Sequence, residues 1–130
     1  MKNMTFLRRV LVADAAISGT TGLLILLAAN PLSKMLGVPA ELLRYSGASL
    51  IPFTALLAYV ITRDNLARTT VQTVIALNAV WVVASIALLF SDQIAPNRLG
   101  TAFIIVQAVM VALFAEMQYV GLRKVGVNAV

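Results

Sequence analysis

The chain contains no cysteine and no histidine among its 130 residues. The absence of cysteine excludes disulfides, thiolate metal sites and cysteine nucleophiles. The absence of histidine removes the usual ligand of haem and zinc and the commonest general base. Redox-cofactor and hydrolase chemistry therefore have little support, and we expect a protein without cofactor or metal that is not an enzyme.

Charged residues are also few. They make up 12% of the chain, whereas 61% is hydrophobic and the mean hydropathy is +0.94. Soluble domains carry about 25% charged residues, so the excess apolar surface needs lipid. Lys and Arg outnumber Asp and Glu by ten to five, but the positive charges lie near the ends of apolar stretches, where they set membrane topology. We expect a lipid bilayer, and no nucleic acid, as partner.

Four apolar stretches without Lys or Arg are each about 20 residues long, the length that crosses a hydrocarbon core about 30 Å thick. They cover residues 10–29, 45–62, 70–90 and 99–120. The connections between them are short, which predicts an all-α, polytopic membrane protein with a single domain over residues 1–130. We expect its four transmembrane helices to form two helical hairpins.

Positive side chains are distributed unequally between the two sides of this predicted bundle. Cytoplasmic connections of membrane proteins are enriched in Lys and Arg. One side carries seven of the ten, which are Lys2, Arg8, Arg9, Arg63, Arg68, Arg123 and Lys124. The other side carries Lys34, Arg44 and Arg98. The majority places both termini in the cytoplasm, in agreement with an even number of spans.

The first outer connection carries helix signals of its own. Asn30 can cap a helix, Pro31 suits a first turn and Gly37 suits a helix end, which together predict a short helix at the membrane surface. Glu41 is placed favourably for the start of the second spanning helix. Pro52 lies in the middle of that helix, where it removes a backbone hydrogen bond and should bend the axis.

Asp14 is the most informative polar residue of the first span. Ser18 lies one turn further and Thr21 lies seven residues after Asp14, so the three share one helix face. A charged side chain facing lipid costs about 2.5 to 3.5 kcal/mol near the bilayer centre. This face must therefore turn into the bundle or toward a polar partner.

The third and fourth spans carry polar residues at comparable depth. Asn78 and Ser85, seven residues apart, form a similar stripe in the third span, and Glu116 in the fourth could meet Asp14 and Asn78. One interpretation is a polar pocket or a site for a proton or cation, because intramembrane carboxylates commonly mark ion paths. The other is that the acids pair with arginines that bend toward the interface, namely Arg9, Arg63, Arg68 or Arg123.

Gln107 lies nine residues before Glu116, about half a circumference away on an α-helix. One of these two side chains should face the bundle interior, and the other a neighbouring helix or protomer. Gln107 is therefore a candidate subunit contact. The alternative is a hydrogen bond within the bundle.

Several short segments complete a recognisable pattern along nearly the whole chain. They are Asp14-Ala15, Gly19 with Gly22-Leu23, Pro31-Leu32, Leu36-Gly37-Val38-Pro39, Leu42-Leu43-Arg44, Leu77-Asn78-Ala79-Val80-Trp81 and Leu99-Gly100-Thr101-Ala102. Together they resemble a family of small, uncharacterised four-helix integral membrane proteins of bacteria. The resemblance implies four helices and an inner-membrane location, and it transfers no catalytic residue because the family has no assigned activity.

Two functions fit these observations. We expect a non-enzymatic bundle that binds a partner membrane protein, a lipid or a small amphipathic ligand, as a homo-oligomer or an accessory subunit, because four short helices enclose little volume. The alternative is a small oligomeric transporter or channel in which Asp14 and Glu116 bind a proton or cation. An enzyme is disfavoured, since two acids without His, Cys or a metal-ligand cluster make a poor catalytic set.

Overall fold

The chain is all-helical in the computed structural model, which describes residues 2–64, 66–92 and 94–129, with the side chains of 5–64, 66–92 and 94–124. Its helices are α1 (Lys2–Leu27), α2 (Ala29–Leu36), α3 (Ala40–Thr62), α4 (Arg68–Leu89) and α5 (Arg98–Ala129). By length and composition, all except the short α2 can cross a membrane. The predicted all-α chain with four apolar candidate spans is confirmed.

The four long helices begin before the apolar stretches that predict them. α1 already begins at Lys2 and α3 at Ala40, whereas the predicted spans begin at residues 10 and 45. Hydropathy marks only the lipid-like part of a helix, and residues such as Arg and Lys are good helix formers. The helical backbone therefore continues through the charged ends.

α2 ends at Leu36 and Gly37 caps it, as predicted for this glycine. Gly37 has φ +71° in the left-handed region, which glycine adopts at no steric cost. A Cβ there would lie 3.0 Å from the backbone nitrogen of Asn97, so the position also lets the α4–α5 connection approach. Asn30 does not cap α2, which begins one residue earlier; instead its side-chain oxygen accepts a 2.7 Å hydrogen bond from Arg44.

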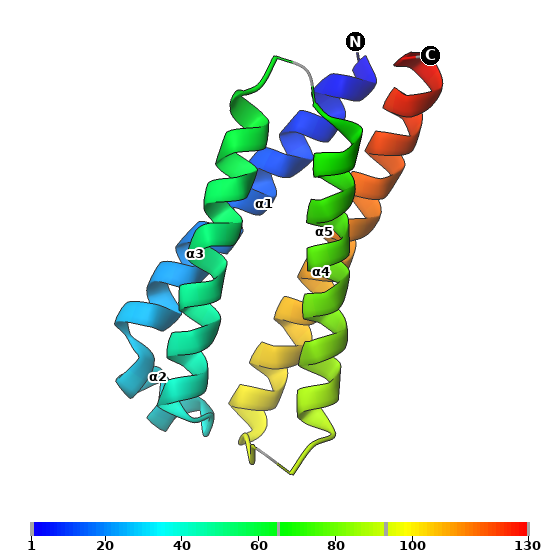
Figure 1. The fold of residues 1–130 in the computed structure, drawn as a ribbon. Helices are drawn as coiled ribbons and strands as arrows, with labels where there is room; N and C mark the ends of the chain where they lie inside the picture. Colours follow the sequence, from blue (N-terminus) through cyan, green and yellow to red (C-terminus); the bar gives the residue numbers. More distant parts are fainter. Residues whose placement is uncertain (1, 65, 93, 130) are drawn as a thin grey trace.

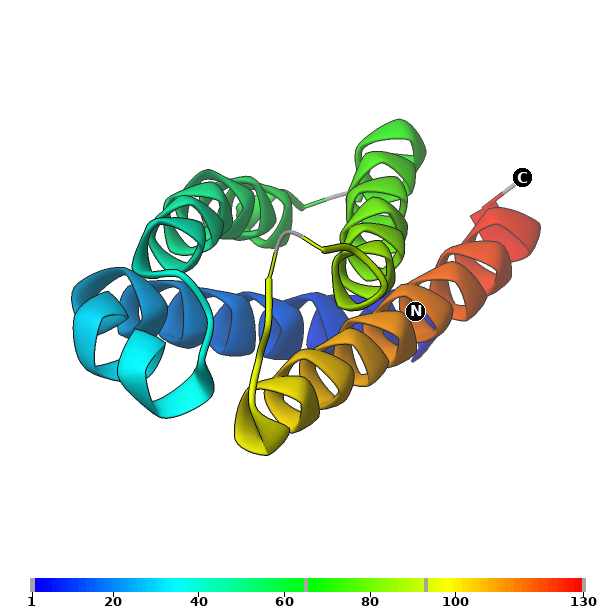
Figure 2. The ribbon, with the colours of Figure 1, turned by 90° about the horizontal axis from the view of Figure 1, so that it is seen from below.

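The most extensive packing joins α1 to α3 and α4 to α5, and α5 also packs along α1. α3 and α4 contact each other little. Both termini and the α3–α4 connection lie at one end of the molecule, and α2 lies at the other (Figure 1). Seen from the α2 end, α3 and α4 stand apart on the same side of α1 (Figure 2).

Glycines let α1 and α3 cross closely. A Cβ at Gly47 of α3 would lie 2.7 Å from the backbone oxygen of Gly22 and 2.9 Å from the backbone nitrogen of Leu26 in α1. A Cβ at Gly22 would lie 2.9 Å from the Cβ of Leu50. These distances are too short for real carbon contacts, so the crossing requires glycine. Helix association in lipid depends on such close packing.

Two apolar clusters lie toward the two ends of the bundle. The cluster near the termini consists of Leu7, Leu11, Leu57, Val60, Leu66, Val71, Val74 and Leu122. The cluster near α2 consists of Ile25, Ala29, Leu36, Val38, Leu43 and Ile104. The segments of α1, α4 and α5 between these clusters carry the buried polar residues.

Candidate functional site

Asp14 is the centre of a hydrogen-bonded cluster that joins three helices. Its side chain is 1% exposed. Its Oδ1 accepts a hydrogen bond from Ser18 Oγ at 2.9 Å, and its Oδ2 accepts from Asn78 Nδ2 of α4 at 3.0 Å and from Gln118 Nε2 of α5 at 2.6 Å. Three neutral donors thus converge on two oxygens. These three donors occupy lone pairs on both oxygens of the carboxyl group.

Asn78 and Gln118 also bond to each other. Asn78 Nδ2 donates its second hydrogen bond to Gln118 Oε1 at 2.9 Å, and the two side chains are 4% and 0% exposed. Among the described residues, every side-chain nitrogen or oxygen atom that is itself fully enclosed has a partner. These hydrogen bonds between buried side chains of α1, α4 and α5 hold the three helices in one arrangement.

A second polar cluster links α4 and α5 nearer to α2. Trp81 Nε1 donates to Gln107 Oε1 at 2.7 Å, and Gln107 Nε2 donates to Ser85 Oγ at 3.0 Å and to the backbone oxygen of Ile104 at 2.8 Å. Ser85 in turn donates to the backbone oxygen of Trp81 at 2.8 Å. Ser85 therefore belongs to this cluster and not to that of Asp14.

The structure brings together three of the predicted site residues, Asp14, Ser18 and Asn78. Thr21 is half-buried and is not a partner of Asp14. It shares the helix face of Asp14 but lies about 10 Å further along the axis. A shared face therefore aligned the two side chains without placing them in contact.

The alternative that Asp14 pairs with an arginine is not what the structure shows. Its partners are Ser18 and two amides. Arg9 is exposed and lies about 140° around the helix from Asp14. Arg63 lies over the ring of Tyr59 at 5.5 Å.

Glu116 does not meet Asp14, contrary to the expectation from depth. It is exposed on α5, whereas Gln118 is fully buried in the cluster. The two residues lie about 200° apart around the helix. Similar depth is therefore insufficient to place Glu116 in the site, because its side chain projects from the side of α5 opposite to Gln118.

Gln107 faces the interior, which is the second of the two alternatives considered for it. Its amide is engaged by Trp81, Ser85 and a backbone oxygen. The spacing of eleven residues between Gln107 and Gln118 corresponds to three turns, with an offset of only about 20°. This spacing was the signal in the sequence that could have identified Gln118, which was not among the predicted site residues.

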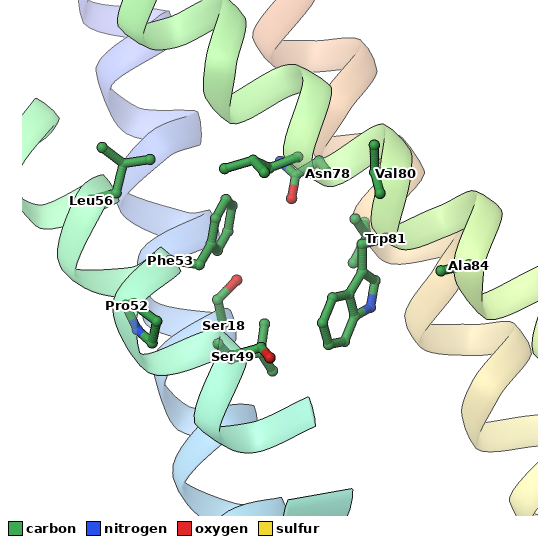
Figure 3. A pocket seen from close by; sticks show the side chains of 12 residues that line it. Ser18, Ser49, Pro52, Phe53, Leu56, Asn78, Val80, Trp81 and Ala84 are labelled. Atoms are coloured by element: carbon green, nitrogen blue, oxygen red, sulfur yellow. The ribbon is translucent and has the colours of Figure 1, made fainter. Parts of the chain in front are cut away.

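A pocket of about 420 Å³ lies beside the Asp14 cluster, between α3 and α4 (Figure 3). It is lined by Ser18, Ser49, Leu50, Pro52, Phe53, Leu56, Leu77, Asn78, Val80, Trp81, Ala84 and Val111. Ser49 and Pro52 on α3 and Leu77 and Val80 on α4 are exposed. The mouth of the pocket therefore lies on the side of the bundle, and Ser18 of α1 forms part of its inner wall.

The polar side chains described at this site are joined by hydrogen bonds. Among the described residues, no three acidic side chains gather as a metal site. Among the described members of its cluster, Asp14 is the only titratable side chain, and its hydrogen-bond partners are Ser18, Asn78 and Gln118. No protein-family model, curated protein or solved structure matches the chain.

Proposed function

We propose that this is a non-enzymatic, multi-pass membrane protein that binds a lipid or a small amphipathic ligand in the pocket between α3 and α4. The pocket carries the proposal. Its volume of about 420 Å³ lies in the range of about 300 to 1,000 Å³ found for ligand sites, which are mostly apolar with a few placed polar groups. Its mouth on the side of the bundle would admit a ligand directly from the bilayer.

Trp81 provides the test, because it lines the pocket and is the only tryptophan of the chain. Lipids with bromine on their acyl chains quench tryptophan on contact. Ala84→Phe should fill the pocket from α4 and reduce this quenching. Ala79→Phe is the matched control, since Ala79 is exposed on the same helix and lies outside the pocket lining. Equal quenching in both variants and the wild type would refute occupancy of the pocket by acyl chains.

The proposal includes the bacterial inner membrane, with both termini in the cytoplasm. The resemblance to small bacterial inner-membrane proteins supports the compartment. The end of the molecule that holds the termini and the α3–α4 connection (Figure 1) carries most of the Lys and Arg residues, which supports the orientation.

The orientation can be tested by cysteine labelling, because the chain has no cysteine of its own. Asp92→Cys and Asp64→Cys place one thiol at an exposed position near each end of the bundle. A membrane-impermeant maleimide should label Asp92→Cys in intact cells and Asp64→Cys only after lysis. The reverse pattern contradicts the orientation.

Assembly as a homo-oligomer or with a partner membrane protein was expected because four short helices enclose little volume, and Gln107 was the candidate contact. That side chain is engaged inside the bundle. It therefore does not supply the expected subunit contact, and assembly stays a prediction based on the small volume that four helices enclose.

A small transporter or channel is the second candidate, favoured by one observation. Asp14 is buried inside a candidate span, and all its described partners are neutral. Intramembrane acids commonly mark proton and ion paths. Glu116 is exposed on α5 and could contribute only between copies of the chain. Proton or cation flux into liposomes should then be lost in Asp14→Asn, and equal flux in wild type and variant removes this mechanism.

A further inference from the structure

Among the described residues that line the pocket, no side chain has a polar hydrogen left for a ligand. Those with polar atoms are Ser18, Ser49, Asn78 and Trp81. Each serine donates its single hydroxyl hydrogen elsewhere, Ser18 to Asp14 at 2.9 Å and Ser49 to the backbone oxygen of Tyr45 at 2.8 Å. The indole N–H of Trp81 is held by Gln107. The serine oxygens can still accept, because a hydroxyl group has two lone pairs.

Asn78 presents its carbonyl oxygen to the pocket. Its Nδ2 donates to Asp14 Oδ2 and Gln118 Oε1, so both amide hydrogens are committed. Turning the amide over would place its oxygen against these two acceptors. Its oxygen is directed into the pocket (Figure 3), and no described residue donates a hydrogen bond to it, although the side chain is only 4% exposed.

The Asp14 carboxylate lies directly behind this inner wall. Both wall residues, Ser18 and Asn78, donate to it. A hydrogen bond that a group donates polarises it and strengthens the next bond that it accepts. The negative charge also attracts a cation more strongly here than in water, because the interior has a low dielectric constant. The wall therefore offers only acceptors and is backed by an anion.

Resting on the proposed function, we infer that the ligand is an apolar molecule whose head group donates hydrogen bonds, with a primary ammonium preferred over a hydroxyl. Its head would lie at Ser18 and Asn78, and its apolar part against Phe53 and Leu56 on α3. A carboxylate head would find no donor on the lining side chains and would be repelled by Asp14. Fatty acids should therefore be rejected.

Four molecules with the same dodecyl chain test this head-group preference. Dodecylamine, dodecanol, dodecyltrimethylammonium and dodecanoate are used to displace 1-bromododecane from wild-type protein in maltoside micelles at pH 7, and recovery of Trp81 fluorescence is measured. Dodecylamine should bind about tenfold more tightly than dodecanol, because hydrogen bonds involving a charged group are stronger than neutral ones. Dodecyltrimethylammonium, which has no donor, should bind less tightly than either, and dodecanoate least of all.

Two variants connect the preference to the site. Ala84→Phe should abolish the specific displacement, which separates the pocket from partitioning into the micelle. Asp14→Asn removes the charge and keeps an amide oxygen for Asn78 and Gln118, so dodecylamine and dodecanol should then bind about equally. If Asp14→Asn does not fold, the wild-type series decides alone.

The outcomes separate this inference from the proposed function. Equal displacement by all four molecules, abolished by Ala84→Phe, overturns the head-group preference and leaves an unselective apolar pocket. Equal binding of dodecyltrimethylammonium and dodecylamine also overturns it, because the site would then respond to charge without hydrogen bonding. If neither the four molecules nor Ala84→Phe changes the quenching by 1-bromododecane, the proposed function is refuted as well.

Discussion

Replacing Asp14 by leucine should destabilise the protein much more than replacing it by asparagine. Leucine removes the acceptor of three hydrogen bonds, at 2.9, 3.0 and 2.6 Å. Ser18 can turn its hydroxyl group to a backbone carbonyl one turn earlier, whereas one N–H of Asn78 and one of Gln118 lose their partner. Asparagine can keep an oxygen facing both amides and donate its own N–H to Ser18.

The magnitude follows from these two orphaned donors. Each buried donor without a partner costs about 1 to 3 kcal/mol in soluble proteins, and hydrogen bonds between membrane helices average about 0.6 kcal/mol with a maximum near 1.7. We therefore expect Asp14→Leu to lower the free energy of unfolding by about 2 to 3 kcal/mol. We expect a loss of about 1 kcal/mol or less for Asp14→Asn, because its hydrogen bonds become neutral but a buried charge is also removed.

Unfolding in mixed micelles of a mild detergent and dodecyl sulfate measures this difference, with helical circular dichroism as one probe and Trp81 fluorescence as another. The combined variant Asp14→Leu, Asn78→Leu and Gln118→Met should be more stable than Asp14→Leu alone, because replacing all the partners by apolar groups leaves no orphaned donor. If Asp14→Leu is as stable as the wild type, a stabilising role for the cluster is refuted. Equal loss in Asp14→Leu and Asp14→Asn would show that charge, and not hydrogen bonding, determines the stability.

Three further predictions use the same unfolding measurement. Gly47→Ala should be destabilising although alanine is the better helix former by about 1 kcal/mol, because the new Cβ would lie 2.7 Å from the α1 backbone; a stabilised variant contradicts the close crossing. Gln107→Leu should cost about 1 to 3 kcal/mol and change the emission of Trp81, whose N–H loses its acceptor, whereas the exposed Glu116→Gln should stay within about 0.5 kcal/mol of wild type. Asn97→Ala should cost about 0.5 to 2 kcal/mol, since the Asn97 side chain caps the first turn of α5 with a 2.8 Å hydrogen bond; an unchanged stability would mean that water replaces this cap.

Three residues of the Asp14 cluster were predicted from the sequence, and the fourth, Gln118, was not. The helical face of Asp14 and Ser18 and the position of Asn78 follow from periodicity and the cost of exposing polar groups to lipid. Depth along the helices predicted Glu116 as their partner. The partner is Gln118, because its side chain leaves α5 on the side that faces Asp14, whereas Glu116 is exposed. In an apolar helix the charge of Glu116 makes it a stronger candidate for a polar site than the neutral amide of Gln118. Gln118 is nevertheless the residue that is buried.

The pocket depends on features that no single helix encodes. Its lining residues come from four helices, and most of them are apolar side chains that resemble any lipid-facing residue in the sequence. The pocket exists because α3 packs on α1 and α4 packs on α5, with little contact between α3 and α4. The orientation of the Asn78 amide, which defines the acceptor wall, likewise depends on partners in α1 and α5.

The sequence by itself determined that the chain is helical, that four of its segments are apolar enough to span a bilayer, and that Asp14 needs a polar partner. These properties arise from local composition and from the cost of placing one side chain in lipid, so each can be evaluated helix by helix. Only the tertiary structure decided which partners Asp14 has, that Gln107 faces inward, and that a pocket lies between α3 and α4. These depend on the relative rotation and separation of helices, which are set by close contacts such as that of Gly22 with Gly47.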